Sequence, residues 1–316
     1  MSARLKHVAE YAALRVVGGC VNVLPYRAAL GVGWVLALAG FHIVRFRRRE
    51  AERRIREVFG DRYSARETRR IAWISFRNLL FSAIEILRSP RMTLKEFDAI
   101  SDFREAFDVV ARQQAAGRGA ILAFPHMGSW ELPGRALLLR GMPVFSVAGR
   151  QKNPLFDRYL NATREKMGVP IVMRGSSALK AIVTRLKGGG FLALLPDVRM
   201  PAAGVRVRFL GQEANVGAGM ALFARHAGVP IYPAIMRRIG WARHEGRLYP
   251  PIESDPALDK KADVQRLTQE VMDLVAAAIQ SEPEQWFWYN KRWIFDPVEP
   301  ENPPDGLDGG GALRQT

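Results

Sequence analysis

The chain contains almost no cysteine. Cys20 is the single cysteine among 316 residues, so no disulfide can form within one chain. Disulfides are typical of secreted and extracellular proteins, whereas reducing compartments keep thiols free. The composition therefore favours a protein that faces the cytoplasm.

Several catalytic signatures are also missing. No G-x-S-x-G occurs, which argues against an ordinary esterase. No G-x-x-x-x-G-K-[ST] occurs, and "GAGMAL" lacks the third glycine of a dinucleotide-binding loop. The five histidines are scattered and form no H-E-x-x-H. We therefore expect neither a nucleotide cofactor nor a catalytic metal.

Acidic residues are scarce relative to basic ones. Lys and Arg number 47 against 31 Asp and Glu, which gives a net charge of +16. Such a surface attracts nucleic acid, anionic lipid headgroups or an acidic protein. No basic-aromatic RNA-binding module is present and most aromatic residues lie in apolar runs, so nucleic acid is the least favoured partner.

The N-terminal part indicates a membrane anchor. Residues 28–44 contain no Asp, Glu, Lys or Arg, and as a helix they would be about 25 Å long, just short of a bilayer core. Residues 45–56 follow directly with seven arginines and two glutamates. An apolar segment followed by arginines is typical of an anchor whose downstream side is cytoplasmic. The alternatives left open are an interfacial anchor instead of a full span, and a solvated helix face for the arginine run.

The rest of the chain predicts an α/β fold. Residues 65–89 form an amphipathic pattern that ends before Pro90, and we interpret Glu85 as lying at the margin of its apolar stripe. From about residue 102, short apolar runs alternate with helical segments, which predicts a mostly parallel sheet flanked by helices. We predict three parts: an N-terminal membrane anchor with a basic segment (1–62), an α/β domain (63–297) and a disordered tail rich in Pro and Gly (298–316).

The segment "ILAFPHMGSWEL" (121–132) carries the chemistry. Pro125 ends a predicted strand, Ser129 is a plausible helix N-cap, and a carboxylate in the first helical turn is favoured by the helix dipole. A spacing of five residues does not place His126 and Glu131 on one helix face, but the loop lets His126 turn toward Glu131. The pair would lie at the carboxyl edge of the sheet, where ligands of open α/β sheets bind.

A histidine held by a carboxylate acts as a general base. No obvious protein nucleophile accompanies His126, because Ser129 lacks the surrounding elbow motif. The base would therefore deprotonate a hydroxyl of the substrate.

These residues carry a resemblance to a known family. The H-x4-E pattern resembles the H-x4-D/E signature of glycerolipid acyltransferases, and the whole segment resembles the lipid A biosynthesis acyltransferases, the lauroyl and myristoyl transferases of Gram-negative bacteria. The similarity covers about residues 8–297. It continues in order through "AGRQKNPLFDRYLNATREKMG", "RGSSALKAIVTRLKGGGFLALLPD", "VRVRFLGQEANVGAGMALFARHAGVPIYPAIMRR" and "PEQWFWYNKRW".

The resemblance implies a membrane-associated acyltransferase. It would move a fatty acyl chain from acyl-acyl carrier protein or acyl-CoA to a hydroxyl of a glycolipid, with a lipid A precursor as the first choice. The expected place is the inner membrane, with the catalytic domain on the cytoplasmic side. Basic charge suits both an acidic carrier protein and a phosphorylated lipid. Other lipid acceptors, such as a phosphatidylinositol mannoside, a lysophospholipid or an aminolipid, stay open, as does a non-catalytic membrane scaffold.

The resemblance also implies three catalytic residues. His126 would take the proton of the acceptor hydroxyl and Glu131 would orient the imidazole. Arg150 would stabilise the tetrahedral oxyanion, with backbone N–H groups after Ser129 as the alternative donors.

Four further residues are candidates for substrate binding. Asn153 and Arg174 would bind the phosphate or sugar of the acceptor, Asp197 would cap or order the acceptor loop, and Arg292 would bind phosphate.

Two positions depart from the family pattern. Val198 replaces the polar residue that usually follows the aspartate, and Asn290 and Lys291 stand where His-Arg is usual. Lysine offers a point charge where arginine offers a fork, so both departures bear on the acceptor more than on the reaction.

Overall fold

A computed structural model of the chain describes all residues except 1–2, 149–152, 169, 174–177 and 299–316. The predicted site residues Arg150 and Arg174, and almost all of the predicted disordered tail, therefore lie outside the described residues.

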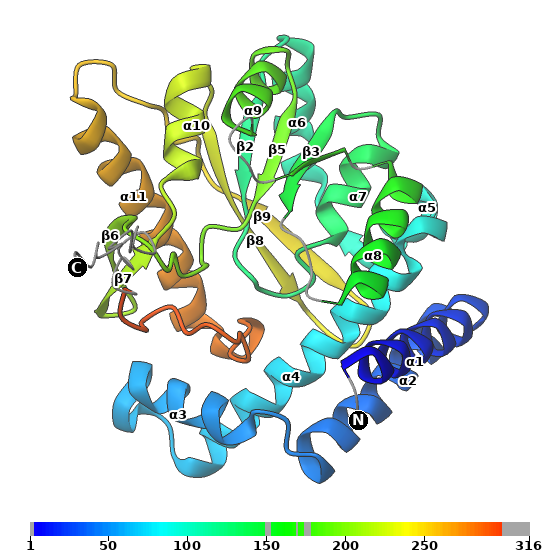
Figure 1. The fold of residues 1–316 in the computed structure, drawn as a ribbon. Coiled ribbons are helices and arrows are strands. Elements are labelled where there is room, and N and C mark those ends of the chain that lie inside the picture. Colours follow the sequence, from blue (N-terminus) through cyan, green and yellow to red (C-terminus); the bar gives the residue numbers. More distant parts are fainter. Residues whose placement is uncertain (1–2, 149–152, 169, 174–177, 299–316) are drawn as a thin grey trace, which may run out of the picture.

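A seven-stranded sheet forms the centre of the fold, in the order β1-β9-β8-β2-β5-β3-β4 (Figure 1). All neighbouring strands are parallel except β8 and β9, which are antiparallel. This arrangement confirms the predicted α/β class with a mostly parallel sheet. The strands are β1 (Ser101–Asp102), β2 (Ala120–Ala123), β3 (Val144–Ala148), β4 (Ile171–Met173), β5 (Phe191–Leu194), β8 (Ile231–Arg238) and β9 (His244–Leu248).

Helices cover both faces of this sheet. Side chains alternate along a strand, so Ile121 and Ala123 of the central β2 enter one core while Ala120 and Leu122 enter the other. The first core also takes side chains from α4, α9, α10 and α11, and the second from α5, α6 and α7. These helices are α5 (Leu94–Ile100), α6 (Arg104–Ala115), α7 (Leu132–Leu139), α9 (Ala178–Lys187), α10 (Gly219–Ala227) and α11 (Lys260–Ser281). Helix α8 (Pro154–Met167) packs on α1, near the N-terminus.

A small antiparallel sheet interrupts the predicted pattern. The sequence predicts one extended segment from Val205 and then a helix from Val216, but the structure has two strands, β6 (Val205–Phe209) and β7 (Gln212–Val216), before α10. The turn between them contains Leu210 and Gly211, both with positive φ, which suits a two-residue hairpin. The predicted start of this helix at Val216 is therefore wrong.

Four helices precede α5 in the described chain, namely α1 (Ala3–Val23), α2 (Tyr26–Leu38), α3 (Arg48–Phe59) and α4 (Ala65–Arg88). The helix of α2 continues as a π-helical turn, so that Tyr26–Ile43 is long and apolar enough to cross a membrane. One side of α2 nevertheless packs on α4, where a Cβ on Gly33 would lie 3.0 Å from Ile84 and 3.3 Å from Phe81. The domain boundary at residue 62 stays a prediction.

Glu85 lies at the centre of a buried polar cluster, so its predicted place at the margin of an apolar stripe is wrong. Its side chain is 0% exposed, and it accepts hydrogen bonds from Tyr26 (2.6 Å) and Ser129 (2.5 Å). Arg238 lies 2.7 Å and His244 3.0 Å from its carboxylate. Burial would raise the pKa of Glu85, but attraction to Arg238 and His244 outweighs it and holds the pKa below its usual range. The cluster thereby joins α2, α4, β8, β9 and the loop after β2.

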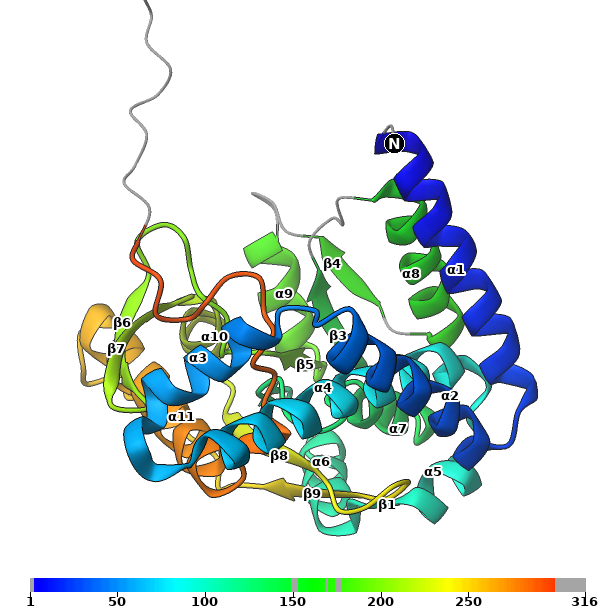
Figure 2. The same cartoon turned by 90° about the horizontal axis from the view of Figure 1, so that it is seen from below.

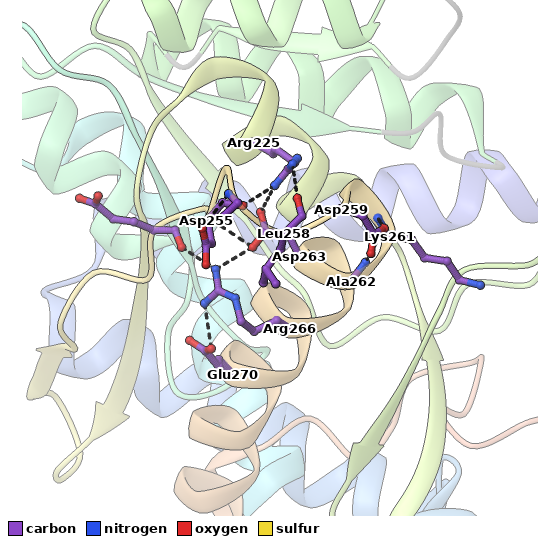
Figure 3. Close-up of polar contacts among 11 residues, drawn as sticks. Arg225, Asp255, Leu258, Asp259, Lys261, Ala262, Asp263, Arg266 and Glu270 are labelled. Atoms are coloured by element: carbon purple, nitrogen blue, oxygen red, sulfur yellow. Dashed lines mark hydrogen bonds and ion pairs between the residues drawn. The ribbon is translucent and has the colours of Figure 1, made fainter.

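A second buried carboxylate, Asp263, lies in the first turn of α11 (Figure 3). Arg225 of α10 and Arg266 of α11 pair with its two oxygens at 2.6 and 2.7 Å. Arg225 also donates to the carbonyl oxygens of Asp255 and Leu258. These contacts fix the loop before α11 and keep α10 and α11 together.

Replacing Glu85 should destabilise the protein strongly. In Glu85→Gln the buried guanidinium of Arg238 keeps its charge but loses its counter-ion, and breaking a buried pair in this way costs about 3–5 kcal/mol. The check is thermal unfolding of the purified protein. Glu253→Gln is the matched control, because the Glu253 side chain is 63% exposed and its ion pair with Arg118 is 3.6 Å long. Equal melting temperatures for the two variants would contradict this account of the cluster.

Candidate active site

His126 and Asp197 meet because they follow neighbouring parallel strands. In the pairing of β2 with β5, Ala123 lies opposite Leu194. His126 and Asp197 each come three residues later, and a proline precedes each of them. The strand register therefore brings both side chains to the same point at the carboxyl edge of the sheet.

The contact between the two side chains is direct. His126 Nδ1 lies 2.9 Å from Asp197 Oδ1, and the backbone N–H of His126 donates to Asp197 Oδ2 at 2.8 Å. Trp286 Nε1 donates to Oδ2 as well, also at 2.8 Å. Because a carboxylate only accepts hydrogen bonds, the proton belongs on Nδ1, which leaves Nε2 as the basic nitrogen.

Opposing effects set the protonation of this pair. Burial disfavours the charged imidazolium, but attraction to Asp197, the hydrogen bond to it and the charge of Glu131 together raise the pKa of His126 above its ordinary value. Burial would raise the pKa of Asp197, but His126 and the hydrogen bond from Trp286 lower it. The result is an imidazole held in one tautomer beside a permanent carboxylate, which is the arrangement of a general base.

The loop after His126 is held on several sides. Gly128 has a φ of +55°, and a Cβ there would lie 2.6 Å from the carbonyl oxygen of Met236, so only glycine fits. Its N–H donates to the carbonyl of Gln285 at 3.0 Å, and its own carbonyl accepts from Ser82 at 2.9 Å. The carbonyl of His126 accepts from the N–H of Phe287 at 3.0 Å. The position of His126 is therefore fixed by α4, β8 and residues 283–294, here called the C-terminal block.

Ser129 does not cap the following helix, so that prediction is wrong. Its side chain is 0% exposed and donates to Glu85, because a buried ionised carboxylate attracts a hydroxyl more strongly than a helix terminus does. Helix α7 begins at Leu132 with Glu131 at the N-cap position and a proline in its first turn. Ser129 is thus neither exposed nor directed to His126 as a nucleophile would be.

Asp197 makes the contact with the His126 imidazole that the sequence led us to expect from Glu131. It was predicted to order an acceptor loop, whereas it holds the Nδ1 of His126. Glu131 contributes its charge to the pKa of His126. Its predicted role in orienting the imidazole stays a prediction.

A pocket opens at the pair, and the C-terminal block forms much of its wall. Asn290 and Arg292 line it together with His126, Asp197, Trp286, Phe287, Trp293 and Ile294. The ring of Trp130 packs edge-on against the His126 ring, with 5.3 Å between the two ring centres. Arg292 is exposed, so the structure places this predicted phosphate ligand at the mouth of the pocket.

One arginine of the basic run supports that wall. Arg54 of α3 is 1% exposed and donates to the carbonyl oxygens of Trp288 and Asn290 at 2.9 and 2.7 Å. Its guanidinium also lies 4.7 Å from the centre of the Trp293 ring. The arginine run is thus partly structural, and neither a membrane anchor nor a solvated face accounts for Arg54.

Asn153 is engaged elsewhere. Its amide donates to Glu10 at 2.9 Å and to the carbonyl of His7 at 3.2 Å, both on α1, and its oxygen accepts from the N–H of Leu155. These contacts tie α8 to α1, and its predicted role in acceptor binding stays a prediction. Among the described residues, no three His, Cys, Asp or Glu side chains are placed to hold a metal ion.

The pairing of His126 with Asp197 was not predicted, although the sequence contains a signal for it. The segments "LAFPH" and "LALLPD" share a short apolar run that ends in a proline followed directly by the polar residue. Two such endings on adjacent parallel strands place their polar residues together. The role of Trp286 had no comparable signal, because an aromatic in "QWFWY" resembles core packing.

The chain is similar to known bacterial acyltransferases. The family of bacterial lipid A biosynthesis acyltransferases matches residues 2–294. A phosphatidylinositol mannoside acyltransferase of Mycolicibacterium smegmatis is 29% identical over 57% of this chain and 59% of its own length. One from Mycobacterium tuberculosis is 30% identical over 67% of this chain and 66% of its own length.

A lipid A biosynthesis palmitoleoyltransferase of Escherichia coli is 24% identical over 80% of both chains. The chain spans less than two thirds of the length of the two mycobacterial relatives. The family match, in contrast, covers both strand endings of the site and the C-terminal block that lines it. The chain therefore belongs to the bacterial lipid A biosynthesis acyltransferase family.

Proposed function

We propose that this protein transfers a fatty acyl group from a thioester to a hydroxyl of a phosphorylated glycolipid. The donor is acyl-acyl carrier protein or acyl-CoA, and a lipid A precursor is the first acceptor. No cofactor other than the acyl thioester takes part. The reaction takes place at the cytoplasmic side of the inner membrane.

One observation carries the proposal: a well-supported base lies in a pocket whose neighbouring serine is unavailable. Ser129, the nearest hydroxyl in the sequence, is buried and donates its proton to Glu85. The hydroxyl that His126 activates must then arrive with a substrate, which is the pattern of acyl transfer to an alcohol.

The steps follow from the pair. His126 Nε2 accepts the proton as the acceptor oxygen attacks the thioester carbonyl, and Asp197 stabilises the imidazolium that forms. The C–O bond forms first, and the tetrahedral intermediate then breaks its C–S bond. The thiolate leaves with the proton that Nε2 had accepted, so the base returns to its starting state. Arg150 or backbone N–H groups near Glu131 are the proposed oxyanion donors.

The charge of the protein supports the choice of substrates. A net charge of +16 attracts both an acidic carrier protein and a phosphorylated lipid over long range. Arg292 at the pocket mouth suits a phosphate of the acceptor or of the donor. The apolar helix Tyr26–Ile43 suits an enzyme whose acceptor stays in a membrane.

A second acceptor is favoured by the comparisons. The mycobacterial relatives with 29% and 30% identity are named for phosphatidylinositol mannoside. A phosphatidylinositol mannoside is therefore the second candidate.

The proposal is tested by supplying purified protein with acyl-acyl carrier protein or acyl-CoA and either acceptor, and by following the acyl mass on the lipid. We expect acyl gain with wild-type protein and a loss of about 10²–10⁴-fold in rate with His126→Ala, because the general base is gone. His226→Ala, at an exposed histidine on α10, is the matched control and should keep full activity. If no lipid gains an acyl group and the donor stays loaded, the proposal is wrong.

Asp197 should control the pH dependence of the rate. Only neutral His126 accepts a proton, so kcat/KM should rise with pH through the raised pKa of His126. Asp197→Asn removes the main cause of that raised pKa, so the inflection should move to lower pH while the maximal rate falls. Glu131→Gln should move the inflection less. The measurement is the pH profile of kcat/KM for the three proteins, and a larger shift with Glu131→Gln would reverse the assignment.

Arg292 should contribute to binding rather than to chemistry. Arg292→Ala removes a charged hydrogen-bond donor worth about 1.5–3 kcal/mol, so KM for one substrate should rise about tenfold or more while kcat changes little. Arg206→Ala is the control, because Arg206 is exposed on β6 and pairs with Glu213 at 3.0 Å. Steady-state kinetics with each substrate varied in turn would show which of them Arg292 binds, and an unchanged KM for both would exclude it from the site.

A further inference from the structure

Helix α1 packs one side on the protein, where Val21 is buried, and carries a second apolar stripe that is exposed. Val8, Ala12, Val16, Gly19 and Val23 are spaced three or four residues apart and are all exposed, Val16 to 66% and Val23 to 80%. An amphipathic helix of a soluble protein normally buries such a stripe against the core. Within the described part of the chain, this stripe of α1 is therefore not covered by a protein core.

Helix α2 has an exposed apolar side as well. Ala29, Leu30 and Ala37 are buried toward α4, whereas Val35 is 57% and Ile43 80% exposed. Since one side of α2 is packed on α4 over most of its length, α2 cannot leave the domain to cross a bilayer without exposing that core. It lies along the surface of the domain instead, beside α1 (Figure 2).

A third segment, about 200 residues later in the chain, extends this surface. In the turn between β8 and β9, Ile239 is 44% and Trp241 is 42% exposed. Trp241 Nε1 donates to the carbonyl of Arg27 on α2 at 3.5 Å, and its ring centre lies 6.5 Å from that of Trp34. Two partly exposed tryptophans thus bridge the turn and α2.

Exposed arginines flank the same segments. Arg15 lies on α1, Arg27 on α2, Arg45 directly after Val44, and Arg243 in the β8–β9 turn. Apolar side chains with tryptophan at their border and arginine beside them match the layers of an anionic membrane surface, where rings lie among headgroups and cations meet phosphate.

We propose that the stripe of α1, the exposed side of α2 and the β8–β9 turn form one lipid-docking face. On this face the protein rests on an anionic bilayer, with α1 and α2 in the interfacial plane and not across it. The proposal does not depend on acyl transfer, because it involves no residue of the His126 pocket.

Vesicle flotation of the full chain tests the face. Wild-type protein should float with vesicles of phosphatidylcholine and phosphatidylglycerol, and less with phosphatidylcholine alone. Trp241→Ser should lower the partition coefficient about tenfold, and the double variant Val16→Ser with Val23→Ser should lower it by a similar factor. Each change removes apolar area that docking on the bilayer would bury. Leu179→Ser is the matched control, since Leu179 is 44% exposed on α9 and lies outside the face.

Activity on detergent-dispersed lipid should stay unchanged in these variants, which separates a failure of docking from a failure of the proposed reaction. Wild-type binding by both the Trp241 and the valine variants would overturn the docking face, as would a wild-type protein that does not float with anionic vesicles.

The single cysteine reports whether α2 crosses the membrane. Cys20 is exposed on α1, ahead of α2, so a spanning α2 would place it on the side opposite to the catalytic domain. A membrane-impermeant maleimide should leave Cys20 unlabelled in intact spheroplasts that express the full chain, and label it after detergent is added. Leu179→Cys in a Cys20→Ser background marks the side of the catalytic domain. The interfacial arrangement would be overturned if, in intact spheroplasts, the wild-type chain were labelled at Cys20 while the Leu179→Cys variant stayed unlabelled.

Discussion

The site depends on one register, the parallel pairing of β2 with β5. Ala123 lies opposite Leu194, and the two strands end in the same way, so that His126 and Asp197 leave the sheet side by side. A shift of one residue would turn the side chains of either strand to the other face and separate the pair. Two fully separate cores flank β2 and make such a shift costly, since Ile121 and Leu122 would exchange environments. The geometry of the His126–Asp197 pair is thus a consequence of core packing.

The buried Glu85 cluster also fixes the position of the loop that follows β2. The Glu85 cluster contains a carboxylate, Arg238 and His244, all essentially without solvent contact, and it holds Ser129 three residues after the base. Such a cluster is expensive in desolvation and is stable only when its hydrogen bonds are made. The cluster therefore restricts the conformation of the loop from His126 to Ser129, because few other conformations of this loop would keep the hydrogen bonds of Glu85.

The sequence predicted the class of the fold and the strand before His126, because these follow from local apolar periodicity, while the role of His126 as the base stays a prediction. It did not predict which strands are neighbours, since β2 and β5 are adjacent in space but lie about 70 residues apart in the chain. For that reason Asp197 was assigned to an acceptor loop. The predicted place of Glu85 at the margin of an apolar stripe was wrong for a related reason. Its partners come from α2, β8, β9 and the loop after β2, and no local sequence pattern predicts them. The hairpin of β6 and β7 was missed because Leu210 supplies a positive φ where glycine would have been expected first.

Helix α4 contacts both α2, which belongs to the proposed docking face, and the loop that carries His126. Phe81 and Ile84 contact α2 at Gly33, while Ser82 and Glu85, on the same two turns, hold Gly128 and Ser129. About two turns before Ser82, Ser75 donates to the carbonyl of Trp286, whose ring N–H donates to Asp197. A lipid acceptor that stays in the bilayer must meet the base at a defined height above the membrane. A single rigid helix that carries both the proposed docking face and the supports of the catalytic loop fixes that height, because neither can move without the other.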